Sequence, residues 1–367
     1  MSRFRLFLPL VLLAAARAGA SAPAQSAEST PAPKQPAAAA IEQRLAAAAR
    51  RNPDSFDAQY QLAAFYLQKG TLKTALPYLQ RAHAINPSSY ECGHDLSLAL
   101  LEIGQLDEAR SLINQMVSVS DHAELHDLLG NVEERAGNRA AAADEYQRAA
   151  HMDPTEEHLF DWGDYLLRLD EYEGADQVFT AAIERHPESA RLHVGLGIAK
   201  YSRGQHEAAV KSFCRAADLT PSDPRAYQFL GEMYGVIPAM AGEIIERLAR
   251  FAKAHPRDAL AQFYYAMSLW KGQSDSTPDL KQVEALLRRA VTLDRTLAKA
   301  LLELGILLAD QQRYLEAIPP LQSAARLQPD LAQAHYRLAQ VYQRTGQDAL
   351  AAKQFAIFER LNARPPR

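Results

Sequence analysis

The feature that most constrains this chain is a recurrence, about every 34 residues, of the same helix-like pattern. Glycines that separate two helix-like stretches recur with this period, at Gly70, Gly104, Gly137, Gly204 and Gly346. Prolines recur where the second stretch should end, at Pro87, Pro154, Pro187, Pro221, Pro256 and Pro329. Self-similarity at this period is typical of stacked helical hairpins, each of which needs a neighbour to bury its apolar face. The sequence therefore predicts an all-α, right-handed α-solenoid.

The segment 60–85 illustrates one hairpin. Leu62 and Tyr66 follow the helical period of a first helix. Gly70 then permits a turn, and Pro87 ends the second helix because proline has no backbone N–H to donate. Small residues beside large ones along both stretches allow two helices to approach closely.

The pattern resembles the tetratricopeptide repeat, whose signature combines a Leu-small pair in the first helix with A-x3-F in the second. The Leu-small pair occurs, among other places, as Leu129-Gly130, Leu196-Gly197, Leu230-Gly231 and Leu304-Gly305. The second element occurs as Ala142 with Tyr146, Ala175 with Phe179, Ala209 with Phe213 and Ala351 with Phe355. Nine repeats begin near Phe56, Tyr90, Ala123, Glu156, Ala190, Pro224, Ala259, Ala298 and Ala332. The resemblance implies a solenoid that binds proteins or peptides.

The sequence predicts separate segments before and after the repeats. Residues 1–20 read as a cleaved signal peptide, because Arg3 and Arg5 precede a short apolar run and small residues follow. Residues 21–40 are rich in Ala and Pro and are expected to form a disordered tether. Residues 41–55 are expected to form an N-terminal capping helix, 56–361 the nine repeats, and 362–367 a tail. No other stretch is long and apolar enough to span a membrane, so an exported, periplasmic or secreted protein is predicted.

Charge and cysteine content exclude some classes of protein. The chain has 40 Lys and Arg against 44 Asp and Glu, which gives no electrostatic basis for nucleic-acid binding. The two cysteines, Cys92 and Cys214, fall in separate repeats of a stiff array, so we expect both to be buried free thiols.

Two repeats depart from the pattern. Around 235–243 the turn contains Pro238, and Ile244 stands where the signature has alanine. The next repeat carries an insertion at 274–279 and Val283 at the small position. A hinge in this part of the array is one interpretation.

The sequence contains no catalytic constellation, phosphate-binding glycine loop or C-x-x-C motif. We therefore predict no enzyme activity, no cofactor, no metal and no small-molecule substrate. The nearest metal-like feature is His122 with His126, whose i, i+4 spacing places both on one helix face but supplies no third ligand.

In proteins of the family that this chain resembles, first helices line a concave groove that holds a partner. Helical spacing assigns apolar, aromatic and basic residues to that face in the later repeats. The predicted groove residues are Arg191, Val194, Ile198, Tyr201, Arg225, Phe263, Met267, Trp270, Lys299, Leu302 and Ile306. Acidic residues occupy the same face earlier, at Glu91, Glu124, Asp127, Glu134, Glu157 and Asp164, where a merely solvated surface is the simpler interpretation. For the apolar residues, packing between adjacent first helices is the alternative to binding.

The leading hypothesis is an exported, non-enzymatic interaction scaffold that binds a peptide segment or partner protein in this groove. A role in cell-envelope assembly or secretion would suit it. The alternatives are a self-associating structural protein and a metal-dependent protein that uses His122 and His126.

Overall fold

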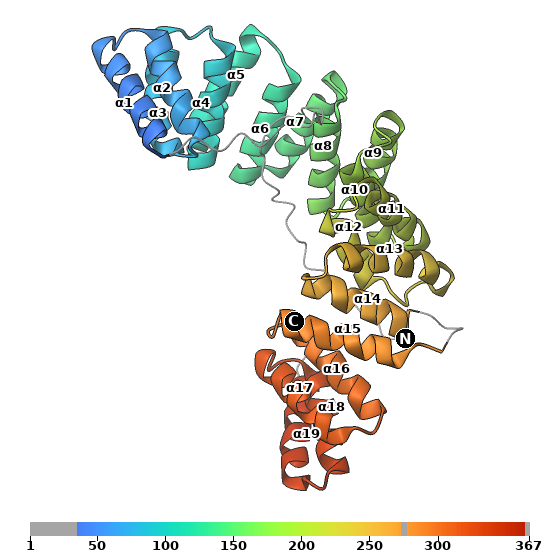
Figure 1. Ribbon diagram of the computed structural model, residues 1–367. Helices are drawn as coiled ribbons and strands as arrows, with labels where there is room; N and C mark the ends of the chain where they lie inside the picture. Colours follow the sequence, from blue (N-terminus) through green and yellow to red (C-terminus); the bar gives the residue numbers. More distant parts are fainter. Residues whose placement is uncertain (1–34, 273–276, 364–367) are drawn as a thin grey trace. The chain divides into compact units, whose positions relative to one another are not determined.

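The computed structural model describes residues 35–272 and 277–363. Within these ranges the chain forms 19 α-helices and one short 3-10 helix, and no strand (Figure 1). The predicted all-α solenoid of helical hairpins is confirmed. The chain divides into two compact units, residues 1–88 and 89–367, and the described part of each is treated separately.

The helices pair into nine hairpins, with one additional helix before them. Unit 1 contains α1 (Gln35–Arg51) and repeat 1, formed by α2 (Phe56–Gln68) and α3 (Leu72–Ile85). Repeats 2–5 are α4 (Tyr90–Ile103) with α5 (Leu106–Val119), α6 (Ala123–Ala136) with α7 (Arg139–Met152), α8 (Glu156–Arg168) with α9 (Tyr172–Arg185), and α10 (Ala190–Ser202) with α11 (His206–Leu219). Repeats 6–9 are α12 (Pro224–Glu232) with η1 (Pro238–Met240) and α13 (Ala241–Ala254), α14 (Ala259–Lys271) with α15 (Leu280–Leu293), α16 (Ala298–Asp310) with α17 (Tyr314–Leu327), and α18 (Ala332–Arg344) with α19 (Asp348–Asn362).

In unit 1, α1 packs against α2. Glu42 accepts hydrogen bonds from the hydroxyl of Tyr66 at 3.1 Å and from Lys69 at 2.8 Å. The helix begins at Gln35, earlier than the predicted start at residue 41, because the alanines at 37–40 are strong helix formers. The predicted signal peptide and residues 21–34 of the predicted tether lie outside the described residues.

Six of the nine first helices begin where a short polar side chain accepts an otherwise unpaired backbone N–H group of the first turn. The residues that cap in this way are Ser55, Ser89, Thr155, Ser189, Asp223 and Asp258. Several hairpins turn at a glycine with positive φ, for example Gly104 at +89° and Gly137 at +82°. Residues with a side chain rarely adopt this conformation, which explains the glycine period in the sequence.

Within unit 2 the small residue of the Leu-small pair leaves a space that the aromatic ring of the A-x3-F element fills. A Cβ added at Gly130 would lie 2.8 Å from the ring of Tyr146, and one added at Gly197 would lie 2.5 Å from Phe213. The small residue of the first helix therefore makes room for the aromatic residue of the second helix. The Leu-small pair and A-x3-F are thus two halves of one contact.

Repeat 6 departs from this arrangement. Its first helix, α12, has only nine residues and is followed by an irregular segment that includes Gly235 at φ +75°. The ring over Gly231 is that of Tyr264, from the first helix of the next repeat, and a Cβ at Gly231 would lie 2.3 Å from it. The irregularity that the sequence predicts around Pro238 is thus confirmed.

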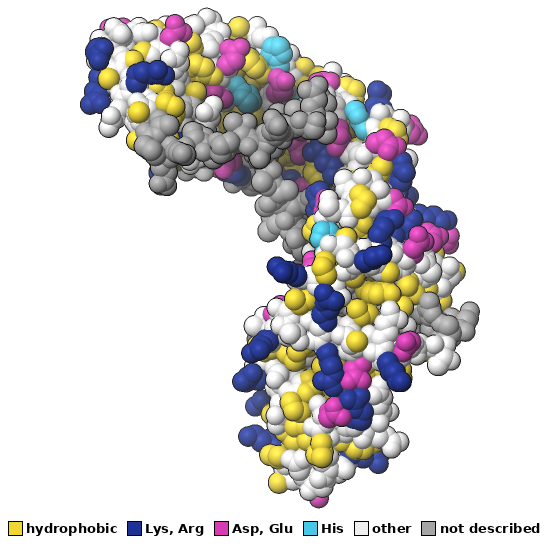
Figure 2. All heavy atoms as spheres, in the orientation of Figure 1, with side chains coloured by type: hydrophobic (Ala, Val, Ile, Leu, Met, Phe, Trp, Pro, Cys, Tyr) yellow, Lys and Arg dark blue, Asp and Glu magenta, His cyan; other side chains and the backbone are white. Residues whose placement is uncertain are grey.

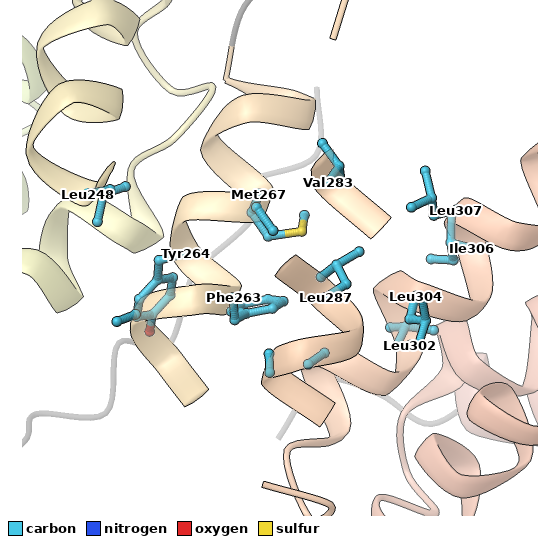
Figure 3. Close-up of a cluster of buried hydrophobic side chains, with 14 of the residues drawn as sticks. Leu248, Phe263, Tyr264, Met267, Val283, Leu287, Leu302, Leu304, Ile306 and Leu307 are labelled. Atoms are coloured by element: carbon cyan, nitrogen blue, oxygen red, sulfur yellow. The ribbon is translucent and has the colours of Figure 1, made fainter. Parts of the chain in front are cut away.

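The core of the later repeats is continuous. One cluster of buried side chains extends from Val194 in α10 to Ala351 in α19, and Figure 3 shows its central part. Cys92 and Cys214 are both buried, and neither forms a disulfide, as predicted. Burial raises the pKa of Cys92 to about 11 and that of Cys214 to about 12. No helix in residues 35–272 or 277–363 combines the length and the apolar content needed to cross a membrane.

Candidate protein-binding surface

The predicted surface lies on the first helices α10, α12, α14 and α16. These helices alternate with the second helices along the chain, and α12 packs directly against α14. The first helices α12 and α14 are therefore close enough for their side chains to meet.

Five of the predicted groove residues are buried. Their exposed fractions are 4% for Val194, 4% for Phe263, 0% for Met267, 5% for Leu302 and 3% for Ile306. This burial favours the alternative of internal packing for these five side chains, and binding of a partner through them stays a prediction.

The physical reason for their burial is visible in Figure 3. Phe263 and Met267 belong to the same buried cluster as Leu287 and Val283 of α15, the second helix of their own hairpin. The periodic pattern that suggested an exposed apolar face instead marks internal packing at these positions.

Three of the apolar residues remain partly exposed. Ile198 and Tyr201 of α10 and Trp270 of α14 lie at the edge of the core and pack against it without being enclosed. Partly exposed aromatic side chains are the kind of residue that anchors partners in many protein interfaces. Whether this set binds a partner stays a prediction.

The three basic residues of the set are accessible, but each is already paired within the chain. Arg191 donates to Glu156 at 2.6 Å and lies over the ring of Phe160 at 4.9 Å. Burial alone would raise the pKa of Glu156, but hydrogen bonds from Ser189 and Arg191 outweigh it and lower that pKa. Arg191 therefore stabilises the charged form of a partly buried carboxylate.

Arg225 and Lys299 behave similarly. Arg225 folds back onto Asp223, the cap of its own helix, and the hydrogen bond between them raises the pKa of Arg225. Lys299 donates to Glu232 at 2.8 Å, and the hydroxyl of Tyr264 donates to the same carboxylate at 2.9 Å. Glu232 thus joins repeats 6, 7 and 8.

Sequence reasoning missed the acidic members of this surface. Glu232 of α12 forms an ion pair with Lys299. Glu303 of α16 forms one with Lys271, at 2.5 Å. Tyr234 lies in the same region, and burial, with these two carboxylates adding to it, raises its pKa to about 12. The sequence could have indicated these ion pairs, because Lys271 and Glu303 lie on first helices one repeat apart and Lys299 and Glu232 on first helices two repeats apart.

The earlier acidic residues have varied surroundings. Glu134 and Asp164 both bind Arg168, and Glu124 accepts a hydrogen bond from the hydroxyl of Tyr90 at 2.7 Å. Glu91 and Glu157 are exposed. The paired members fit a structural role better than a binding role.

Acidic residues outnumber basic ones in the repeats from residue 89 to residue 188. Residues 89–188 contain 23 acidic and 6 basic side chains, whereas residues 189–363 contain 17 acidic and 22 basic ones. On the face drawn in Figure 2, Lys and Arg side chains are frequent over α14–α19. The slightly negative net charge of the chain therefore hides a strong separation of charge along it.

His122 and His126 do not form a pair of metal ligands. His122 precedes α6 in an extended conformation and hydrogen-bonds Ser120 at 2.7 Å. His126 is 2% exposed, and both of its ring nitrogens face carboxylates, Glu145 at 2.6 Å and Asp121 at 2.5 Å. Within residues 35–272 and 277–363 no group of three or more metal-ligating side chains converges.

Comparison with protein families supports the repeat assignment. One tetratricopeptide repeat model matches residues 37–90 and 160–224, and a second matches residues 66–132. Residues 243–364 match a model described as a bacterial transcriptional activator domain.

Two human proteins are similar in sequence. Protein O-mannosyl-transferase TMTC1 is 26% identical over 166 residues, which cover 44% of this chain and 19% of that protein. Protein O-mannosyl-transferase TMTC3 is 23% identical over 312 residues, which cover 78% of this chain and 33% of that protein. The chain thus spans a third or less of the length of either relative.

Among solved structures, the C-terminal part of a TPR repeat-containing protein from Cytophaga hutchinsonii has a TM-score of 0.52 and 18% identity. The match covers 66% of this chain and 97% of that structure, and at this identity it shows a shared fold. On its repeat signature, the family matches and this fold, the chain belongs to the tetratricopeptide repeat family, whose fold is built for protein–protein interaction.

Proposed function

We propose that this chain is an exported, non-enzymatic scaffold that binds a peptide segment or a partner protein along its later first helices. The observation that carries the proposal is the partly exposed set Ile198, Tyr201 and Trp270, accompanied by accessible Arg191 and Lys299. Apolar anchors with basic neighbours suit an extended segment that carries both apolar and acidic residues.

Binding would use exchange of ion pairs. The guanidinium of Arg191 and the ammonium of Lys299 now neutralise Glu156 and Glu232. Their side chains are 34% and 56% exposed, so a partner carboxylate can reach them from solvent. Exposed pairs of this kind are weak and are readily replaced.

Export and a place in cell-envelope assembly or secretion are part of the same proposal. They depend on residues 1–20, which lie outside the described residues. Mass spectrometry of the protein isolated from its native cell should find a mature chain that begins at Ser21. A mature chain that retains Met1 would contradict cleavage at this position.

The human relatives motivate a second candidate. Their printed names describe O-mannosyl transfer, and a chain of this family could serve such machinery as its partner-binding part. The proposal assigns no transfer reaction to this chain, because its similarity covers a third or less of either relative. Transfer of mannose by the purified chain alone would contradict it.

Site-specific photo-cross-linking in the native cell tests the binding surface. A photoreactive residue at Tyr201 or Trp270 should capture a specific protein, whereas one at the 85% exposed Val119, on a second helix, should not. Capture only of further copies of the chain would favour the self-associating alternative, and light scattering would then give the oligomeric state.

The captured partner allows a quantitative test. Replacing both Tyr201 and Trp270 with alanine should weaken its binding by about 2 kcal/mol or more if these residues are anchors. Leu315→Ala, at a side chain that is 73% exposed on a second helix, is the matched control and should leave the affinity unchanged. Equal affinity of the double variant and the parent would assign the two aromatic residues a purely structural role.

A further inference from the structure

The charge on the second residue of the first helices changes sign partway along the array. This residue is acidic in repeats 2–4, basic in repeats 5, 6 and 8, and uncharged in repeats 7 and 9. The acidic residues are Glu91, Glu124 and Glu157, and the basic residues are Arg191, Arg225 and Lys299. The change from acidic to basic occurs at the junction of repeats 4 and 5.

The helix dipole explains the acidic residues and leaves the basic ones unexplained. The start of a helix carries partial positive charge, so a glutamate there stabilises its own helix and an arginine there destabilises it. Arg191 and Arg225 are each offset by a nearby carboxylate, Glu156 at 2.6 Å and Asp223 at 2.8 Å. The stability of α10 and α12 therefore gives no reason for an arginine at this position, and a contact with another molecule does.

These residues lie along one edge of unit 2. The hydroxyl of Tyr90, at the start of α4, donates to Glu124, at the start of α6, at 2.7 Å. Ser189, the cap of α10, donates to Glu156, at the start of α8, at 2.6 Å. Such contacts, between residues 34 and 33 positions apart, require the starts of consecutive first helices to be neighbours. The residues that follow this edge are named the charge row: Glu91, Glu124, Glu157, Arg191 and Arg225.

The side chains of the charge row can accept a further partner. Its three glutamates are exposed, and within residues 35–272 and 277–363 none of them forms an ion pair. Arg191 binds Glu156 through Nε, which leaves both terminal NH2 groups of its guanidinium for another carboxylate. The side chains of Arg191 and Arg225 are 34% and 39% exposed, so such a carboxylate can reach them from solvent.

We propose that the charge row binds the charge row of a second copy of this chain, antiparallel, about a twofold axis at the junction of repeats 4 and 5. Glu157 of one copy then meets Arg191 of the other, and Glu124 meets Arg225. Because the axis is twofold, the same two pairs form again with the copies exchanged. The dimer is therefore closed and contains four intermolecular ion pairs.

Spacing and charge both favour a second copy as the partner. The acidic and basic residues are carried by the same repeat, so the distance between neighbours matches on the two copies. The antiparallel alignment also places the acidic repeats, with 23 acidic and 6 basic side chains in residues 89–188, opposite the more basic repeats after residue 188. A parallel alignment in the same register would place glutamate against glutamate. Complementary charge of this kind selects one alignment over the other.

The dimer should be weak and sensitive to salt. Exposed ion pairs contribute little each, and a contact along one edge buries less surface than a permanent interface needs. The dimer shares Arg191 with the proposed partner-binding surface, so a partner and a second copy would compete for it. Dimerisation needs no other protein, however, and its failure would leave the proposed binding of a partner untouched.

Sedimentation velocity of the purified full chain, over a range of concentrations and ionic strengths, tests the proposal. The mass should rise from one chain to two with concentration and rise no further, and added salt should return it toward one. A mass of one chain at every concentration, or growth beyond two chains, would overturn the proposal.

Two charge reversals test the pairs directly. Arg191→Glu with Arg225→Glu makes the charge row wholly acidic, and Glu124→Arg with Glu157→Arg makes its central part basic. Either variant alone should raise the dissociation constant of the dimer by about tenfold or more, because attraction at four pairs becomes repulsion. Mixed in equal amounts, the two variants should form a dimer of one chain of each, since all four pairs are again opposite in charge. A mixture that stays monomeric would overturn the proposal.

A matched control separates the charge row from net charge. Lys211→Glu with Arg215→Glu changes the net charge by the same amount on α11, the second helix of repeat 5, where both side chains are exposed. This variant should dimerise much as the parent does, and a loss equal to that of R191E/R225E would contradict the proposal. Should R191E/R225E fail to fold, R191Q/R225Q removes the charges without adding repulsion and should still weaken the dimer several-fold. An unchanged dissociation constant in R191Q/R225Q would overturn the proposal as well.

Discussion

Repeats 3–5 and repeat 6 meet the same packing requirement with different side chains. In the regular repeats a glycine of the first helix receives the aromatic ring of its own second helix, as Gly197 receives Phe213. In repeat 6 the second helix offers Leu248 at this place, and the ring over Gly231 is that of Tyr264 from the next repeat. The repeat motif therefore describes a hole that must be filled and leaves open which helix fills it.

The difference changes how the repeats depend on one another. When the ring comes from within the hairpin, the contact survives if the next repeat moves away. When it comes from the next first helix, repeat 6 is completed only by repeat 7. The stability of a solenoid is the sum of the stability of each repeat and the contributions of the interfaces between neighbours. For repeat 6, more of the stability comes from its interface with repeat 7.

The largest expected effect comes from removing the rings. Phe213→Ala and Tyr264→Ala should each lower the free energy of unfolding by about 3–5 kcal/mol, because both rings are buried and leave cavities. Urea denaturation followed by circular dichroism measures this, with Leu315→Ala as an exposed control expected to change it by less than about 0.5 kcal/mol. A cost for Tyr264→Ala close to that of the control would remove the proposed filling of repeat 6.

Replacing the glycines that face the rings should have a smaller effect on stability and should show which ring packs against each glycine. Gly197→Ala and Gly231→Ala place a methyl group against a ring and should cost about 1–3 kcal/mol through overpacking. Gly242→Ala, in α13, meets no atom within 4 Å and should instead be neutral or stabilising. Double-mutant cycles should couple Gly231 to Tyr264 and Gly197 to Phe213. Coupling of Gly231 to Leu248 would break the comparison.

The fold could be predicted because its signals are local and repeated. Glycine at a positive φ and the cap residue before most of the first helices are read within one or two turns of chain. The start of α1 was placed late because composition rich in Ala and Pro was read as disorder, although alanine runs also favour helix.

The binding surface was predicted less well than the fold. Helical spacing assigns a residue to one face of its helix, but it does not show which neighbouring helix covers that face. Met267 and Trp270 are three residues apart on α14, yet the first is fully buried and the second is partly exposed. Met267 packs in one buried cluster with Val283 and Leu287 of α15, the second helix of its hairpin. The cross-repeat pair Lys299–Glu232 spans 67 residues and was equally invisible to local periodicity.

The smallest expected effect concerns that pair, which links the irregular repeat 6 to repeat 8. Lys299→Ala should lower the free energy of unfolding by about 1 kcal/mol or less, because the side chain is 56% exposed and solvent screens the interaction. Lys211→Ala, which removes a pair within α11 of repeat 5, should cost a similar small amount. Denaturation at low and at high salt should show both costs shrinking with ionic strength. A larger, salt-independent cost for Lys299→Ala alone would mean that this lysine clamps repeats 6–8 together, and it would then be unavailable to a partner carboxylate.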